Sequence, residues 1–201
     1  MKKISILNRL LLLATSLLAA YQIAIGIEGV NRLSLFSYTI AFGVLLIAAL
    51  LLMILGYEAL ESQLVVIIST LIPLSLAMGL VAEYIPTLDP IYLVFTMIGL
   101  TAVILSRYTF QRKVATIILA IVHGIAGITI FLLPIYLSIT GKTLSGFFMV
   151  SVGGALIGMG GLLLSFLKAG KPLLGEETIL AILPGLLLVT TTAFVAGFLL
   201  G

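Results

Sequence analysis

Residues 35–57 read LFSYTIAFGVLLIAALLLMILGY, and no charged side chain interrupts them. About 20 mostly apolar residues in a helix are enough to cross the hydrocarbon core of a bilayer. Six further segments of the chain have the same character. The predicted helices cover residues 6–27, 35–57, 63–85, 90–107, 113–139, 145–168 and 177–200. We therefore expect an all-α, polytopic integral membrane bundle of about seven transmembrane helices.

Composition supports a membrane protein. Of the 201 residues, 62% are hydrophobic and only 8% are charged. In soluble domains, about 45–50% of the residues are apolar and about 25% are charged. So few charges cannot hydrate the surface of a soluble fold. The connections between the predicted helices are short, so residues 1–201 should form a single transmembrane domain without a soluble one. The net charge of +3 does not indicate nucleic-acid binding, because the basic residues lie in short loops beside apolar runs.

The distribution of lysine and arginine predicts the orientation of the chain. With the N-terminus in the cytoplasm, the basic residues on that side are Lys2, Lys3, Arg9, Arg107, Arg112, Lys113, Lys168 and Lys171. The opposite side then holds only Arg32 and Lys142. Cytoplasmic loops carry an excess of positive charge, so we expect an N-in, C-out, multi-pass protein, in the plasma membrane if the chain is prokaryotic. The first apolar run is longer than the core of a signal peptide and is interpreted as an uncleaved helix.

A weak internal similarity indicates a hypothetical repeat. An offset of 111 residues places residues 1–90 on residues 112–201 and aligns Gly43 with Gly154 and Pro73 with Pro184. The identity is close to chance for a leucine-rich chain. If the repeat is genuine, the plan is three helices, one connecting helix and three helices in parallel. That plan is similar to the one found in small parallel-repeat sugar transporters, but no family motif accompanies it.

Small residues form a stripe along the sixth predicted helix. Its members, spaced to share one helical face, are Ser151, Gly154, Gly158, Gly161 and Ser165. In lipid, such a stripe lets another helix backbone approach closely. Three interpretations stay open: packing within the chain, a contact with a protein partner or a second copy, and a groove for a lipid or quinone tail.

Three prolines fall inside predicted helices, at Pro73, Pro134 and Pro184. A proline in a helix removes one amide donor and bends the helix. Prolines are common in transmembrane helices, where they usually only cause a bend. The alternative is that the bends at Pro73 and Pro184 open a transport cavity near the middle of the membrane.

Three polar residues in or beside the apolar runs are candidates for an intramembrane site. His123 is the only histidine and lies about ten residues into the fifth predicted helix. Intramembrane ionisable groups are costly and are therefore functional candidates, although a neutral histidine bonded to a serine or threonine would be purely structural. Gln22 lies at a similar depth, and its amide must find a hydrogen-bond partner. Glu83 lies near the end of the third predicted helix.

Catalytic and metal-binding motifs are missing from the sequence. It has no cysteine, no HExxH, no GxSxG and no P-loop, so we predict no catalytic residue, no metal site and no cofactor. The favoured function is a non-enzymatic subunit or accessory component of a membrane complex, with a partner or second copy at the face of Gly154, Gly158 and Gly161. The alternatives are a small-solute or ion transporter or channel with a path near His123, Gln22 and Pro73, and a redox or intramembrane enzyme that uses His123.

Overall fold

A computed structural model of the chain describes residues 4–168 and 173–201. In this part of the chain, seven helices are long and apolar enough to cross a membrane, and there is no β-strand. They are α1 (Ile6–Ile25), α2 (Arg32–Leu55), α3 (Gln63–Tyr84), α4 (Asp89–Thr109), α5 (Arg112–Ile139), α6 (Phe148–Lys168) and α7 (Glu176–Leu199). Three short 3-10 helices accompany them, η1 (Gly56–Glu61), η2 (Pro86–Leu88) and η3 (Ser145–Phe147). The prediction of an all-helical, polytopic membrane bundle is confirmed.

The second helix differs most from its expected position. It begins at Arg32, three residues earlier than expected, because Asn31 acts as its N-cap and accepts a hydrogen bond from the Ser34 amide at 2.9 Å. It ends at Leu55, because the next residue, Gly56, has a φ angle of 78°. With a ψ angle of −167°, this backbone conformation lies outside the helical region and is open mainly to glycine. The α-helix therefore stops here, and the chain continues as η1. The last two residues of the predicted helix therefore belong to η1.

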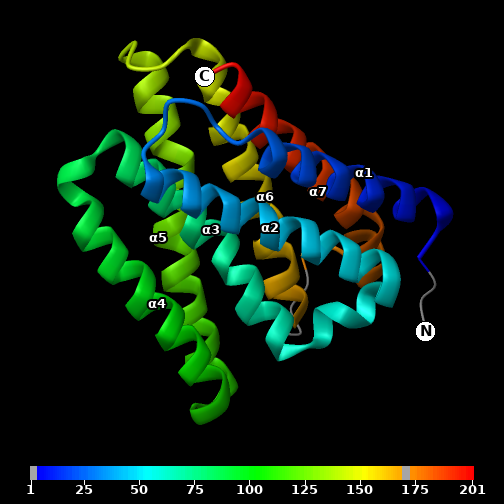
Figure 1. The fold of residues 1–201 in the computed structure, drawn as a ribbon. Coiled ribbons are helices and arrows are strands. Elements are labelled where there is room, and N and C mark those ends of the chain that lie inside the picture. Colours follow the sequence, from blue (N-terminus) through cyan, green and yellow to red (C-terminus); the bar gives the residue numbers. More distant parts are fainter. Residues whose placement is uncertain (1–3, 169–172) are drawn as a thin grey trace.

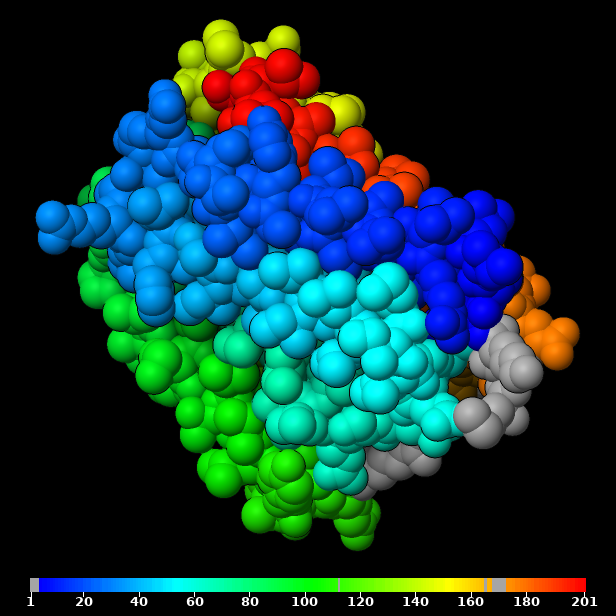
Figure 2. Space-filling view, turned by 45° about the vertical axis from the view of Figure 1, so that its right-hand side comes forward, coloured from blue at the N-terminus to red at the C-terminus, as the bar shows by residue number. Residues whose placement is uncertain are grey.

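Six of the helices surround a common core. Each packs against the next in the order α1, α2, α3, α5, α6 and α7, and α7 packs back against α1. The remaining helix, α4, lies outside this ring against α3 and α5 (Figure 1). Figure 2 shows α1 and α2 covering one face, with the green side chains of α4 toward its edge. This arrangement is compatible with two three-helix halves, α1 to α3 and α5 to α7, that are joined by α4. The internal repeat stays a prediction.

The two ends of the bundle carry different charges. At one end of the bundle α1 begins, α4 is followed by α5, and α6 stops. We call this end the basic end, because Arg9, Arg107 and Lys113 lie there. The chain finishes after α7 at the opposite end (Figure 1). At the basic end, the side-chain amide of Asn8 in α1 donates a hydrogen bond of 3.0 Å to the hydroxyl of Tyr57 in η1. This bond joins α1 to η1.

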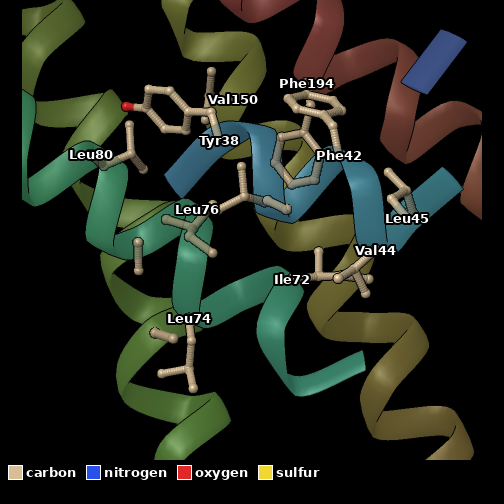
Figure 3. Close-up of a cluster of buried hydrophobic side chains, with 14 of the residues drawn as sticks. Tyr38, Phe42, Val44, Leu45, Ile72, Leu74, Leu76, Leu80, Val150 and Phe194 are labelled. Atoms are coloured by element: carbon tan, nitrogen blue, oxygen red, sulfur yellow. The ribbon is translucent and has the colours of Figure 1, made fainter. Parts of the chain in front are cut away.

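The core is built around α3. Leu74, Leu76 and Leu80 of this helix are almost completely buried, and Figure 3 shows them among side chains of α2, α6 and α7, including Phe42. The α2 helix approaches closely because α3 has a glycine at position 79. A Cβ atom there would overlap the ring of Tyr38. Glycine is thus required at this position by the packing of α2 on α3.

Aromatic side chains close the end opposite the basic end. The ring centroid of Phe198 in α7 lies 4.7 Å from that of Tyr38 and 6.0 Å from that of Phe147. Phe147 in turn lies 5.2 Å from Tyr84. Aromatic pairs at such distances stabilise by more than their buried area alone. The cluster therefore joins α2, α3, η3 and α7 across the middle of the ring.

Candidate functional site

The small-residue stripe of α6 divides into a packed part and an open part. In the packed part, a Cβ atom at Gly154 would lie 2.7 Å from Cγ2 of Ile130 in α5. On the adjacent face, a Cβ atom at Gly153 would lie 2.6 Å from the ring of Phe194 in α7. Ser151, near the start of α6, is completely buried. This half of α6 is therefore held between α5 and α7 within the chain.

The open part of the stripe lies toward the basic end. Gly158 and Gly161 follow Gly154 by four and seven residues, so they share its face. Both are exposed, and a Cβ atom at either would meet no heavy atom within 4 Å. On this face, beyond the contact of Gly154 with Ile130, no side chain of α5 therefore covers the backbone of α6. Ser165 continues the stripe in sequence, but its side chain lies outside the described part.

The wall of α5 that faces this opening also carries small residues. Gly127 and His123 precede Ile130 by three and seven residues and therefore lie on its face. A Cβ atom at Gly127, or at the exposed Gly124 beside it, would meet no heavy atom within 4 Å. We call this open surface the α5–α6 groove. It is formed by His123, Gly124, Gly127, Gly158 and Gly161.

His123 is the polar group of the groove. Its side chain is only partly exposed, and its Nδ1 atom is buried without a hydrogen-bond partner among the described residues. The Leu119 backbone lies within hydrogen-bonding range of the imidazole, and Arg107 of α4 is close enough to interact with it electrostatically. No described serine or threonine hydroxyl is bonded to Nδ1. The nitrogen is enclosed by the chain itself, so a molecule lying against this surface does not reach it.

Gln22 lies in the other half of the bundle. Its Nε2 atom donates to the carbonyl oxygen of Gly26 at 2.9 Å, which completes the C-terminal turn of its own helix. Its Oε1 atom is buried without a partner. The side chain borders a hollow of about 10 Å³ that Tyr38 of α2 also lines. Gln22 and His123 therefore belong to separate places in the structure.

Glu83 has a structural contact. Its Oε2 atom accepts hydrogen bonds from the backbone amide of Asn31 at 2.9 Å and from the side-chain amide of Asn31 at 3.0 Å. The Asn31 side chain also donates to the Ala82 carbonyl at 2.9 Å. The end of α3 is thus tied to the start of α2. Sequence analysis did not select Asn31, although an asparagine just before an apolar run is a helix-start signal.

The three intrahelical prolines are all buried. Pro73 lies in α3, Pro134 in α5 and Pro184 in α7. Pro134 is the one beside the groove. A proline cannot donate to the carbonyl four residues earlier, which here belongs to Ile130, the residue that contacts Gly154. The free carbonyl permits α5 to bend where the groove begins.

Fold and groove together define a class of protein, a polytopic helical membrane bundle with an open surface of small residues between two of its helices. In the described residues, no cluster of three or more histidine, aspartate or glutamate side chains could hold a metal ion. No family model, no curated protein and no solved structure matches this chain.

Proposed function

We propose that the chain is a non-enzymatic component of a membrane protein complex and that a transmembrane helix of another protein packs into the α5–α6 groove. The observation that carries the proposal is the exposed position of Gly158. In the same helix, Gly153 and Gly154 serve close packing within the chain. Helices in lipid associate through such small-residue surfaces, because there the backbones can approach closely.

The small residues on both sides of the groove favour a helix over a lipid tail. A Cβ atom at Gly124, Gly127 or Gly158 would meet no heavy atom within 4 Å. Uncovered glycines of this kind allow the close backbone approach by which helices associate in lipid. The groove also holds no carboxylate that would repel or bind an ion.

A different protein is favoured over a second copy of this chain. In a symmetric dimer, the same surface of each copy meets its counterpart. A symmetric contact would therefore pair Gly158 with its own symmetry mate and leave α5 beside the contact. A single helix of another protein can instead lie against α5 and α6 together.

The transporter alternative has less support. Pro73 is buried within α3, and the hollow beside Gln22 is about 10 Å³ in volume, which is the size of one water molecule. A path past His123, Gln22 and Pro73 would need a second conformation in which α3 moves away from α2.

The proposed orientation has the basic end in the cytoplasm, and the membrane is the plasma membrane if the chain is prokaryotic.

Site-specific photo-crosslinking in native membranes tests the proposal. A photoreactive residue at Ala120, which is exposed one turn from His123 on the basic side, should form a discrete adduct with one other protein. The same residue at Ile121, which faces outward with 57% of its surface exposed, should react mainly with lipid. Gly158→Leu should abolish the protein adduct, because the leucine side chain fills the groove.

Two variants separate loss of binding from loss of folding. Gly158→Leu should leave the thermal unfolding temperature of the chain nearly unchanged, because no heavy atom lies within 4 Å of the new Cβ. Gly154→Leu should lower it strongly, because the leucine would collide with Ile130. The proposal is wrong if position 120 yields only lipid adducts, or an adduct with a second copy of the chain.

A further inference from the structure

The α4 helix has a face that no other described element covers. It lies outside the ring of six helices, where its main contacts are with α3 and α5. Its buried residues, Gly99, Val103 and Ser106, share one side of the helix. The opposite side is open, and Figure 2 shows side chains of α4 along the edge of the molecule. The α5–α6 groove does not include α4, so an inference about this face does not depend on the proposed function.

Exposed residues of α4 repeat with the spacing of a coiled-coil seam. Six of them are separated alternately by three and four residues, and we call them the α4 seam: Ile91, Val94, Ile98, Thr101, Leu105 and Tyr108. The five other than Thr101 are 53–67% exposed. Residues spaced in this way occupy positions a and d of a heptad, along which two helices pack as a left-handed supercoil. The same crossing is the commonest one in membrane bundles.

A hollow lies in the middle of the α4 seam. It has a volume of about 340 Å³ and is lined by Met97, Ile98, Thr101, Ala102 and Leu105. In a coiled coil, each seam residue of one helix enters a hole formed by four residues of the other. In a parallel pair, the hole for a d residue is formed by the preceding a residue, the same d residue, the e residue after it and the next a residue. For position 101 these are residues 98, 101, 102 and 105, so the hollow has the lining that a second α4 seam requires.

The charges of α4 permit a pairing of identical helices. Its two charged residues are Asp89 and Arg107, and neither belongs to the α4 seam. All copies of the chain cross the membrane in the same direction, so a two-fold axis between two copies places their α4 helices parallel. Each seam residue then meets its own counterpart, and no like charges are brought together. We infer that two copies of this chain pair through the α4 seam as a parallel, left-handed coiled coil.

The α4 seam is long enough for this role. From Ile91 to Tyr108 it extends over about 26 Å at about 1.5 Å per residue, which is nearly the full hydrocarbon core of about 30 Å. At this exposure its side chains offer on the order of 600 Å², against about 800 Å² per partner in a standard interface. In lipid, a contact between two single helices is sufficient for a dimer. Lipid covers any apolar face, whereas the heptad spacing and the matching hollow are what a second copy requires.

Cysteine crosslinking in native membranes tests the inference, because the chain contains no cysteine of its own. Cysteines at Ile98 or Leu105 meet their counterparts in the inferred dimer, so oxidation with copper phenanthroline should join two copies by a disulfide. Leu93 is also exposed, at 41%, but lies outside the α4 seam. Ile128 of α5 is 60% exposed, close to the 64% of Ile98. Cysteines at these two control positions should crosslink several-fold less, by random collision alone.

A bulky substitution in the hollow provides a second test. Thr101→Phe fills the hollow and should separate the two helices, so energy transfer between labelled copies in liposomes should fall to the value for random collision. Thr192→Phe in α7 is a matched control, because both threonines are exposed and each hydroxyl donates to the carbonyl four residues earlier at 2.8 Å. Thr192→Phe should keep the energy transfer of the unmodified chain. Gly158→Leu should keep it as well, because it blocks only the α5–α6 groove.

Three results would overturn the inference. The first is that cysteine at Ile98 crosslinks no more than cysteine at Ile128 or at Leu93, which would indicate random contact. The second is that Thr101→Phe leaves the energy transfer unchanged. The third is that a photoreactive residue at Ile98 reacts only with lipid, or with a different protein, which would mean that the α4 seam has another neighbour.

Discussion

At the scale of single residues, glycines in one helix have different roles. A Cβ atom at Gly154 would collide with α5, whereas Gly158 on the same face has open space around it. The spacing of four residues places both on one face, but it does not say which of them a neighbouring helix covers. The same distinction holds between α2 and α3, where Gly79 is covered by Tyr38 and Gly43 has no neighbour within 4 Å.

Gly79→Ala should therefore destabilise the chain, while Gly43→Ala should not. The added methyl at position 79 forces the Tyr38 ring out of its place, and overpacking of this kind costs about 1–3 kcal/mol. At position 43 the methyl enters open space in a helix, where alanine is favoured over glycine by about 0.5–1 kcal/mol. Thermal unfolding in detergent measures both effects. Equal unfolding temperatures for the two variants would contradict the close packing of α2 on α3.

At the scale of secondary-structure elements, Asn31 sets both the start of α2 and its connection to α3. Its side-chain oxygen caps α2 through the Ser34 amide, and its side-chain nitrogen donates to α3 at Ala82 and Glu83. Nearby, the Ser34 hydroxyl donates to the Gly79 carbonyl at 3.0 Å. Together these bonds hold the two helices in one relative position.

Asn31→Ala should lower the free energy of unfolding by about 0.5–2 kcal/mol from the lost cap alone. Asn31→Ser keeps a cap oxygen but loses the bonds of the amide to α3, so its unfolding free energy should lie between those of Asn31→Ala and the unmodified chain. Chemical unfolding in mixed micelles, followed by circular dichroism, provides the comparison. If serine and alanine are equally destabilising, the cap contributes nothing. If neither variant is destabilised, the tie between α2 and α3 has no energetic role.

At the scale of the whole molecule, the charges lie at the ends and the apolar side chains cover the flanks. Large exposed hydrophobic side chains occur on every transmembrane helix, such as Leu17 of α1, Ile98 of α4 and Ile128 of α5. In water these surfaces would aggregate, whereas lipid solvates them. The basic end carries most of the lysine and arginine residues, and this asymmetry predicts that it faces the cytoplasm.

The absence of cysteine from the sequence makes the orientation directly testable. Single cysteines can replace Ser62 and Gln111 at the basic end and Thr87 and Thr140 at the opposite end, all four of which are exposed. A membrane-impermeant maleimide added to intact cells should label only positions 87 and 140. Positions 62 and 111 should react after the cells are permeabilised. The reverse pattern would show that the basic end faces outward.

Much of the architecture could be predicted from sequence patterns. Runs such as residues 35–57 predict membrane helices because helix length and the thickness of a bilayer are fixed physical quantities. The limits of α2 were missed by a few residues, since they depend on the Asn31 cap and on the backbone of Gly56. His123, Gln22 and Glu83 were found as unusual polar residues, but nothing in their spacing showed that they lie in different places.

The number of helices, their lengths and their need for lipid thus follow from the sequence alone, because each depends on residues that are near one another in the chain. The packing of Gly154 against Ile130, the opening beside Gly158 and the pairing of Asn31 with Glu83 do not follow from it. These features depend on how α5 and α6, or α2 and α3, are placed against each other in three dimensions. That placement results from the fit of many side chains at once, which no local pattern records.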